Sequence, residues 1–375
     1  MIKVCTIGIG NCGNQIADLA MSRYQIPGIA INSSQHDLVN IRNITKILVG
    51  DEKGAGKNRD AAKNFIKMHI RTLLQQEKFV NHINEHDIIF LISSIGGGTG
   101  SGMVPLMCDI LSRTFSDKKF ILIEVYPPIG ESLAAQQNSL DYLKEVRMNL
   151  PNVVYMAYDN NKFSDLPTSE MMEKINDEIV EIFPVFRGDY FYPTPYNSID
   201  EKDLMEIVNA SGRLSVFILD NIKEKDFDNK DIEDAMINII KNVSGNVELD
   251  RDKIVKKIGV ITNLNPKLNS MINPTYPKIQ ELIGSPVESF EHTYITSDNN
   301  EVNRVIFILS GLSVPDDRLT KMVQRIESGL ESLVITKESS VLDNTETDKI
   351  KDLRNQIMKP NKEFDLDELF SKYNG

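Results

Sequence analysis

A glycine run at residues 96–102 constrains this chain more than any other feature of its sequence. The letters read Gly-Gly-Gly-Thr-Gly-Ser-Gly, after an unbroken apolar stretch at 87–93 and before a helical pattern at 101–115. Glycines at a strand-to-helix turn expose a row of backbone N–H groups that forms a nest for phosphate oxygens. Thr99 and Ser101 add hydroxyl donors. Since a ligand-free flexible linker rarely lies between a buried strand and a helix, the run predicts a phosphate-binding loop.

Two further glycine-containing segments are less specific. Residues 8–13 fit the Gly-x-Gly-x-x-Gly pattern of dinucleotide-binding loops. A nicotinamide enzyme also needs an acidic residue at the end of the next strand, where this chain has Asn32, so an NAD-dependent oxidoreductase stays a distant alternative. Residues 54–58 contain a Gly-Lys pair but not the P-loop spacing, because Asp51 replaces the first glycine and Asn58 replaces the magnesium-binding Ser or Thr.

The remaining chain alternates strand and helix patterns. Expected strands lie at 2–9, 26–32, 87–93, 120–126 and 152–157, and expected helices at 14–24, 59–82, 101–115 and 131–149. Strands that are apolar on both faces indicate a parallel sheet covered by helices on both sides.

The pattern changes after about residue 205, which predicts a smaller second α/β unit. Its expected strands are 215–220, 257–262, 289–296 and 302–310, and its expected helices are 229–243 and 276–283. The last two strands are predicted to form an antiparallel hairpin around residues 297–300. Residues 318–333 follow as a long amphipathic helix, and 336–350 have the polar composition of a linker.

Composition narrows the function classes. The chain carries 42 Lys and Arg against 54 Asp and Glu, a net charge of -12, which argues against direct nucleic-acid binding. The three cysteines and five histidines show no spacing typical of metal ligands. His82 and His86 are four residues apart, but their neighbours are more typical of a solvated helix end, so no metal site is predicted. No apolar run reaches the ~18 residues of a membrane span, which predicts a cytoplasmic protein without a membrane partner.

The glycine run resembles the signature loop of the tubulin/FtsZ superfamily, and residues 10–16 resemble the first loop of tubulin. This resemblance implies an α/β, tubulin-like fold: a Rossmann-like parallel-sheet GTPase domain, a central helix, a smaller α/β activation domain with a mixed sheet, a long C-terminal helix and a tail. The corresponding boundaries are 1–168 for the nucleotide-binding domain, 169–204 for the central helix and catalytic loop, 205–312 for the activation domain, 313–335 for the C-terminal helix and 336–375 for a flexible tail with a partner-binding segment.

The resemblance also implies which residues contact GTP or GDP. The first four loops supply Gly10, Asn11, Cys12, Gln15, Asn32, Gly54, Ala55, Gly56, Gly96, Gly97, Gly98, Thr99, Gly100 and Ser101. Glu131 is expected at the ribose, Asn160 at the guanine edge, and Asp177, with Asn176 in reserve, at the start of the central helix as base reader. Mg²⁺ is expected with the phosphates.

In this superfamily the loop that activates water comes from the next subunit of a head-to-tail filament. The family pattern Asn-x-Asp-x-x-Asp is matched by Asp200 and Asp203, although the Asn, Asn197, stands one residue early. These acids are expected to polarise water and hold a cation on the neighbouring subunit's nucleotide. The alternative is that Asp200 simply caps the following helix.

Departures from FtsZ, such as Ala135 where FtsZ keeps an arginine, make the chain look most like the plasmid and phage TubZ branch. That likeness implies GTP-driven filaments that segregate DNA through a small DNA-binding adaptor of the TubR type. A divergent FtsZ-type cell-division protein or a phage-positioning tubulin is the alternative. Residues 362–373 carry apolar side chains at helical spacing, which predicts either an adaptor-binding hook or a segment that docks on the chain itself.

Overall fold

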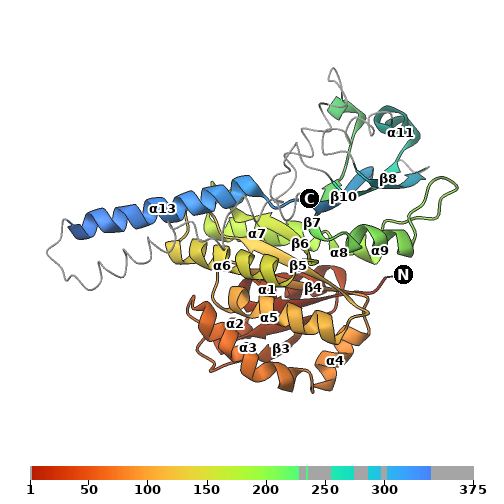
Figure 1. The fold of residues 1–375 in the computed structure, drawn as a ribbon. Helices are drawn as coiled ribbons and strands as arrows, with labels where there is room; N and C mark the ends of the chain where they lie inside the picture. The colour runs from red at the N-terminus through yellow and green to blue at the C-terminus, as the bar shows by residue number, and fades with distance from the viewer. Residues whose placement is uncertain (1, 228–233, 235–254, 274–285, 297–301, 339–375) are drawn as a thin grey trace.

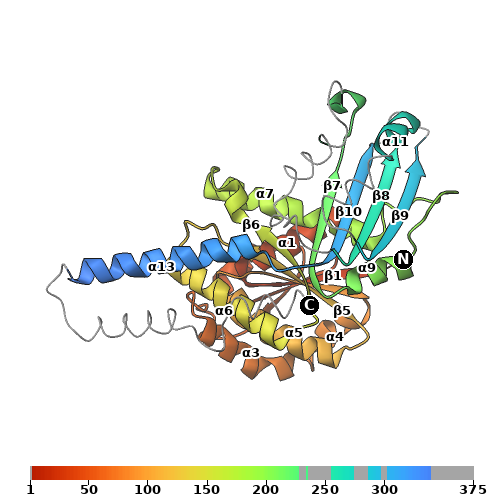
Figure 2. The ribbon, with the colours of Figure 1, turned by 45° about the horizontal axis from the view of Figure 1, so that its top comes forward.

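We describe a computed structural model of the chain, which covers residues 2–227, 234, 255–273, 286–296 and 302–338. Figures 1 and 2 show a sheet layered between helices, with a long helix, α13, running along α6. Within the described residues, no helix is both long and apolar enough to cross a membrane.

The first half of the chain forms a parallel sheet in the order β3-β2-β1-β4-β5-β6. This is the strand order of doubly wound nucleotide-binding folds. The strands are β1 Val4–Ile9, β2 Gly28–Asn32, β3 Thr45–Leu48, β4 Ile88–Ser94, β5 Lys119–Tyr126 and β6 Val154–Asp159. The helices that accompany them are α1 Gly10–Tyr24, α2 Gln35–Val39, α3 Arg59–Leu73, α4 Glu77–Asn84, α5 Thr99–Thr114 and α6 Leu133–Asn149.

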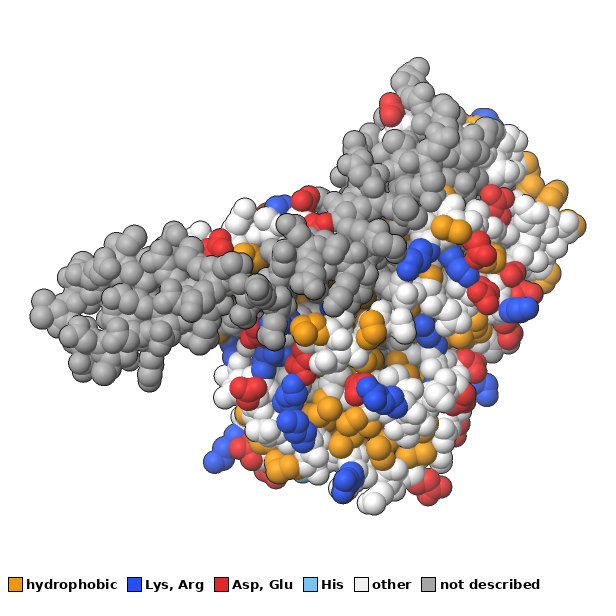
Figure 3. All heavy atoms as spheres, viewed as in Figure 1, with side chains coloured by type: hydrophobic (Ala, Val, Ile, Leu, Met, Phe, Trp, Pro, Cys, Tyr) orange, Lys and Arg blue, Asp and Glu red, His pale blue; other side chains and the backbone are white. Residues whose placement is uncertain are grey.

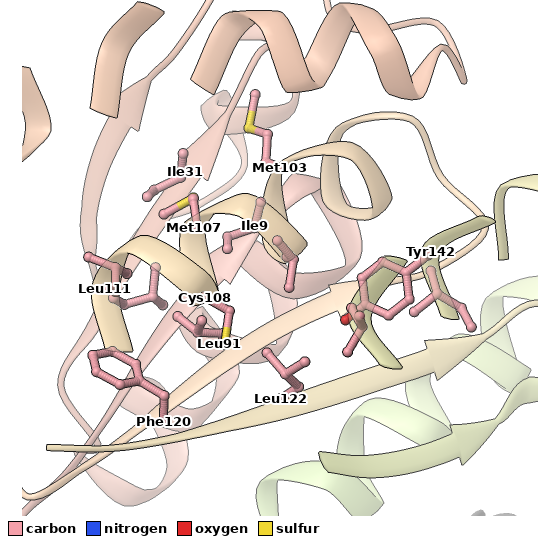
Figure 4. Close-up of a cluster of buried hydrophobic side chains, with 14 of the residues drawn as sticks. Ile9, Ile31, Leu91, Met103, Met107, Cys108, Leu111, Phe120, Leu122 and Tyr142 are labelled. Carbon is pink, nitrogen blue, oxygen red and sulfur yellow. The ribbon is translucent and has the colours of Figure 1, made fainter. Parts of the chain in front are cut away.

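Helices cover both faces of this sheet, as the apolar strands predict. One core joins β1, β4 and β5 to α3, α4, α5, α6 and α13, and part of it is drawn in Figure 4, where Met107 and Leu111 of α5 lie against the sheet. The other core packs α1 and the helices within residues 168–209 against the opposite face. The prediction of a two-sided parallel sheet is therefore confirmed.

A bridge of two residue pairs joins this sheet to the second half of the chain. β7 Gly212–Leu219 runs parallel to β6 through Val154–Gly212 and Tyr155–Arg213. The sheet continues with β10 Arg304–Leu312, β8 Lys257–Leu264 and β9 Glu288–Ile295, giving ten strands in all among the described residues. Helices α7 Thr168–Val180, α8 Phe183–Arg187, α9 Glu201–Asn209, α11 Pro266–Ile272 and α13 Asp316–Glu338, with the short turns η1 Asn160–Phe163 and η2 Glu224–Phe227, complete the described elements.

Three local predictions are wrong. β9 and β10 form no hairpin, because β8 lies between them, antiparallel to β10 and parallel to β9. The single helix expected at 59–82 is two helices, α3 and α4, which break at 74–76. Residues 176–178 lie in the last two turns of α7 and not at the start of the central helix, which begins at Thr168. The helices expected at 229–243 and 276–283 and the tail segment 362–373 lie outside the described residues.

Pro105 shows how the chain compensates for an imperfect helix. A proline inside α5 cannot donate to the carbonyl of Ser101. The guanidinium of Arg59 donates to that carbonyl instead, with Nη2 at 3.0 Å, and also pairs with Glu145 of α6 at 2.9 Å. One side chain of α3 thus fastens α5 and α6 at the end where the glycine run enters its helix.

A fully buried ion pair lies inside the parallel sheet's core. Arg147 of α6 donates from Nη1 and Nη2 to the carboxylate of Glu124 in β5, at 3.0 and 2.9 Å, and its guanidinium lies 3.4 Å from the ring centroid of Tyr155. Burial raises the pKa of Glu124, and the adjacent guanidinium opposes that rise. Each charge depends on the other, because neither reaches water.

We therefore expect Arg147→Met to lower the free energy of unfolding by about 3–5 kcal/mol, since it leaves a buried carboxylate unpaired. Adding Glu124→Gln removes that charge and should recover part of the loss. Urea unfolding followed by circular dichroism measures both effects. A double variant that is less stable than Arg147→Met alone would contradict this explanation.

Candidate functional site

Two glycine-rich turns meet at the carboxyl ends of β1 and β4. Gly10, which opens α1, has φ of +76°, and a Cβ there would lie 3.2 Å from the amide nitrogen of Gly100. At Gly13 a Cβ would lie 1.9 Å from the carbonyl oxygen of Ile92. No residue larger than glycine allows the two turns this approach, so the sequence's glycines bring two helix N-termini together.

The first turns of α1 and α5 leave their backbone N–H groups available. Neither helix has a side-chain hydrogen bond at its N-cap, Ile9 or Gly98, and neither has an acidic residue in its first turn. In contrast, α2, α3 and α6 are capped by Ser34, Asn58 and Ser132. Uncapped N–H groups and the positive end of the helix dipole favour an anion, and here two such ends converge.

The loop at residues 54–58 closes over the glycine run. A Cβ at Gly98 would lie 2.8 Å from the Cα of Lys57 and from the amide nitrogen of Asn58, whereas a Cβ at Gly97 would meet nothing within 4 Å. The glycine run is thus packed at Gly98 and open at Gly97. Open space beside unpaired backbone N–H groups is the arrangement that a phosphate requires.

Asn138 of α6 holds these two loops together. Its Nδ2 donates to the carbonyl of Lys57 at 3.0 Å and to that of Gly96 at 3.2 Å. Sequence reasoning missed Asn138 because it lies inside a helix and belongs to no motif.

The second loop contributes through a residue that was not predicted. Asn32 uses its amide within the loop: Oδ1 accepts from the backbone of Ser34 at 3.1 Å. Ser33 instead contacts the glycine run, with its Oγ 2.8 Å from Oγ1 of Thr99. Asn32 therefore shapes the loop, and Ser33 and Thr99 place two hydroxyls at the phosphate end.

In the first helix, the expected contacts Asn11 and Gln15 lie side by side, with Nε2 of Gln15 donating to Oδ1 of Asn11 at 3.2 Å. Cys12 lies between them and is partly buried. This hydrogen bond holds both exposed amides on one face of α1, at the beginning of the helix.

Glu131, the expected ribose contact, forms an ion pair with Lys57. The distance from Nζ to Oε1 is 3.1 Å, and Nζ also contacts Oγ of Ser132 at 3.1 Å. Both charged side chains remain 40–50% exposed, so the pair is weak and readily exchanged. The contact links the 54–58 loop to the 127–131 loop across the opening of the site.

The other end of the site has an unpaired acceptor. Asn160, which follows β6, is buried, and its Oδ1 has no hydrogen-bond partner. The preceding residue, Asp159, accepts from the backbone of Asn161 at 3.0 Å and pairs with Arg318 of α13 at 2.7 Å. A buried acceptor without a partner is costly unless a ligand supplies the donor.

Asp177, the preferred base reader, is engaged elsewhere. Its Oδ1 accepts from Nη2 of Arg23, in the last turn of α1, at 2.7 Å, and its side chain is 53% exposed. Asn176 is partly buried on the same helix, next to the core residue Ile175. Asn160 thus lies directly after β6 with a free acceptor, whereas Asp177 is held in an ion pair.

Asp200 and Asp203 form a capping box at the start of α9. Oδ1 of Asp200 accepts from the backbone of Asp203 at 2.8 Å, and Oδ2 of Asp203 accepts from the backbone of Asp200 at 3.1 Å. The helix-cap alternative therefore describes a real contact. Asp200 is nevertheless exposed and Asp203 is only partly buried on the same turn, and each carboxylate retains lone pairs for a further donor.

The position of α9 separates these acids from the glycine loops. α9 ends just before β7, and β7 begins at Gly212 beside Val154, the first residue of β6. Figures 1 and 2 show α9 beside the chain's N-terminus, where β1 begins. The glycine loops follow the last residues of β1 and β4, so the acids and the loops lie on opposite edges of one sheet.

A hydrogen-bonded loop on β9 fixes the approach to α9. The carbonyl of Asn197 accepts from the backbone of Thr293 at 2.9 Å, and the backbone of Ile199 donates to Nδ1 of His292 at 3.3 Å. Because Nδ1 accepts here, the ring must be neutral, and burial lowers the pKa of His292 in that direction. The segment before Asp200 is therefore held in place by its neighbours.

These features define a doubly wound parallel sheet whose glycine loops meet at its carboxyl edge, the place where folds of this class bind nucleotides. Residues 3–167 match the family described as Tubulin/FtsZ family, GTPase domain. This match covers 165 of the 375 residues, and the fold of the chain is tubulin-like.

Similar proteins agree on the fold. The tubulin-like protein CetZ of Pyrococcus horikoshii is 29% identical over 220 residues, which span 56% of this chain and 59% of the relative's length. Among solved structures, TubZ of the Clostridium botulinum phage c-st has a TM-score of 0.70 at 19% identity, over 88% of this chain and 99% of that one. A GTPγS-bound protofilament of CetZ2 from Haloferax volcanii has a TM-score of 0.71 at 17% identity, over 90% of this chain and all of that one.

Gly97 gives a direct test of the phosphate cradle. A methyl group there meets no protein atom within 4 Å but enters the open space beside the glycine run, so Gly97→Ala should leave the thermal unfolding temperature unchanged. We expect its affinity for GTP to fall at least about tenfold, equivalent to about 1.4 kcal/mol. Fluorescent-nucleotide titration measures this, and an unchanged affinity would contradict the assignment.

Proposed function

We propose that the chain binds GTP at the carboxyl edge of its sheet and hydrolyses it to GDP and phosphate. The observation that carries this proposal is the convergence of two uncapped helix N-termini on the open turn at Gly97. Backbone N–H groups there hold the phosphate oxygens, and the hydroxyls of Ser33 and Thr99 add donors from two loops. The match of residues 3–167 to the GTPase domain of the Tubulin/FtsZ family supports the same reaction.

Guanine is the base that suits the other end of the site. Guanine presents N–H donors at N1 and N2, and the unpaired Oδ1 of Asn160 is a buried acceptor. Asp177 provides a second acceptor when it exchanges Arg23 for the base, and Asn176 is its alternative. Glu131 contacts the ribose after Lys57 has turned from it to the phosphates, where its ammonium adds a cation.

Magnesium would join this site through the nucleotide. Mg²⁺ is bound mainly by phosphate oxygens and water in such sites, with few protein ligands. The hydroxyl oxygens of Ser33 and Thr99 suit this role, since they lie together at the phosphate end. The ion would supply charge neutralisation of the β- and γ-phosphates.

Hydrolysis requires a second copy of the chain. The acids Asp200 and Asp203 lie at the edge opposite the glycine loops, so they cannot reach the nucleotide of their own subunit. Head-to-tail stacking places the acid-bearing edge of one subunit on the nucleotide of the next, where the acids orient the attacking water. The resulting polymer is a filament, and the protofilament of the similar protein CetZ2 supports this arrangement.

The second part of the proposal concerns what such a filament moves. We propose that the filament segregates plasmid or phage DNA through a DNA-binding adaptor held by the tail at 351–375. Likeness in fold to a phage TubZ supports this, and so does the net charge of -12, because an acidic filament needs an adaptor to hold DNA. On the face shown in Figure 3, the described basic side chains are interspersed with acidic ones and form no continuous basic surface. A cell-division or phage-positioning role is the alternative, and the likeness to Cell division protein FtsZ 2 of Halobacterium salinarum, 24% identical over 244 residues, supports the first of these.

Asp200→Asn separates catalysis from capping. Asparagine caps a helix as well as aspartate does, so the fold of α9 and GTP binding should be preserved. Without the carboxylate, we expect turnover to fall at least about a hundredfold, and filaments to persist where the unchanged protein disassembles. Phosphate release and sedimentation measure these effects, and normal turnover would mean that the acids only cap the helix.

Mixing the Gly97→Ala and Asp200→Asn variants, at a GTP concentration that loads only the second, tests action between subunits. Gly97→Ala retains sound acids and Asp200→Asn retains a sound nucleotide site. In mixed filaments, the acids of the first reach the GTP of the second, so phosphate release should recover partly. Failure to recover at every mixing ratio, with mixed filaments seen by electron microscopy, would rule out catalysis between subunits.

Removing residues 351–375 tests the adaptor proposal. We expect the shortened chain to hydrolyse GTP and form filaments normally but to lose co-sedimentation with adaptor and DNA, because its acidic, apolar-faced segment is gone. Unchanged co-sedimentation would contradict the proposal that residues 362–373 bind the adaptor. Loss of assembly itself would favour docking of the tail on its own subunit.

A further inference from the structure

Three metal-ligating side chains gather away from the nucleotide site. Cys5 comes from the beginning of β1, His82 from α4, and His86 from the turn that leads into β4. Their ligand atoms all lie within 4.8 Å of one another. The two histidines are four residues apart, but Cys5 precedes His82 by 77 residues. Sequence spacing alone therefore does not reveal the group.

The cluster is close to the interior but not sealed. Cys5 is fully buried, His86 is 9% exposed, and His82 is partly buried. The ring centroids of the two histidines are 5.4 Å apart, and the ring of His82 reaches the backbone of Thr6 in β1. A small ion can therefore enter beside the histidines and still be shielded from bulk water by the sheet.

Backbone carbonyls orient all three side chains. Nε2 of His82 contacts the carbonyl of Thr6 at 3.1 Å, Nδ1 of His86 contacts the carbonyl of His82 at 2.7 Å, and the thiol of Cys5 points at that same carbonyl at 3.6 Å. A ring nitrogen that contacts a carbonyl carries the proton, so the other nitrogen of each neutral ring keeps its lone pair. Histidines that bind metals are fixed by their second nitrogen in this way.

We propose that Cys5, His82 and His86 form a binding site for a divalent cation of the Zn²⁺ class, with water as the fourth ligand. One thiolate and two imidazoles suit Zn²⁺ and exclude Mg²⁺ and Ca²⁺, which prefer oxygen ligands. Tetrahedral zinc, with bonds of about 2.0–2.3 Å, draws its ligands to roughly 3.3–3.8 Å from one another, so these side chains close by about 1 Å. On binding, the Cys5 thiol releases its proton to solvent and the sulfur forms the metal bond.

Occupancy would clamp the amino edge of the sheet. His86 is followed by Asp87, whose amide donates to the carbonyl of Lys3 at 2.8 Å and whose carboxylate accepts from the amide of Lys3 at 2.8 Å. The metal would therefore add a link between α4, β1 and the entry to β4. This edge is opposite the glycine loops, so binding to an unassembled subunit should not depend on nucleotide.

Cobalt titration of the full-length, chelator-treated protein tests the site. Co²⁺ bound to a thiolate gives a sulfur-to-metal absorption band, and we expect that band to saturate at one equivalent and to disappear when Zn²⁺ is added. Zn²⁺ should also raise the thermal unfolding temperature, since a ligand of the folded state alone stabilises it. Absence of the band would overturn the proposal. The titration uses the protein without any substitution, so its result does not depend on whether a variant folds.

Variants then assign the ligands. Cys5→Ala should abolish the cobalt band, and His86→Asn should weaken Co²⁺ binding at least about tenfold. Cys108→Ala, which removes another buried thiol outside the cluster, should leave band and affinity unchanged. A band that survives in Cys5→Ala, or that is lost only in Cys108→Ala, would place the metal elsewhere and leave the three side chains as ordinary packing.

Discussion

The structure depends on a contact that only glycine permits. At Gly10 and Gly100, the turns after β1 and β4 approach so closely that a Cβ on either glycine would crowd the opposite turn. Gly13 lets α1 lie against the backbone of β4. Because of these approaches, the N-termini of α1 and α5 open onto the same space. The anion preference of the site follows from this geometry and needs no basic side chain, which fits a chain whose overall charge is negative.

The same sheet that builds the cradle also separates it from the acids. Parallel strands put every glycine loop at their carboxyl ends. β7 runs parallel to β6 and begins beside its first residues, so α9, which ends just before β7, lies at the opposite edge. In our account, this separation is why hydrolysis waits for assembly: one subunit has the nucleotide and its neighbour has the water-activating carboxylates. Arg318, which joins α13 to Asp159 and to the carbonyl of Pro127 at 2.5 Å, ties the long C-terminal helix to the base end of the site.

Much of this was predictable from local sequence, because glycine runs and apolar strands are local signals. The parallel sheet, the two glycine turns and their order all follow from residues within a few positions of one another. Strand partners do not: nothing in 289–310 says that β8 inserts between β9 and β10. Likewise, Asn138 and Ser33 join the site only through contacts made by folding, and the cluster of Cys5, His82 and His86 depends on which strand α4 covers.

The dependence of GTP turnover on protein concentration tests the central claim most directly. If the nucleotide of one subunit meets the acids of the next, phosphate release per subunit should be close to zero at low concentration and should rise steeply above a threshold, in parallel with sedimentable polymer. A turnover per subunit that stays constant from the lowest to the highest concentration would mean that a single chain completes the reaction alone, and it would contradict the account.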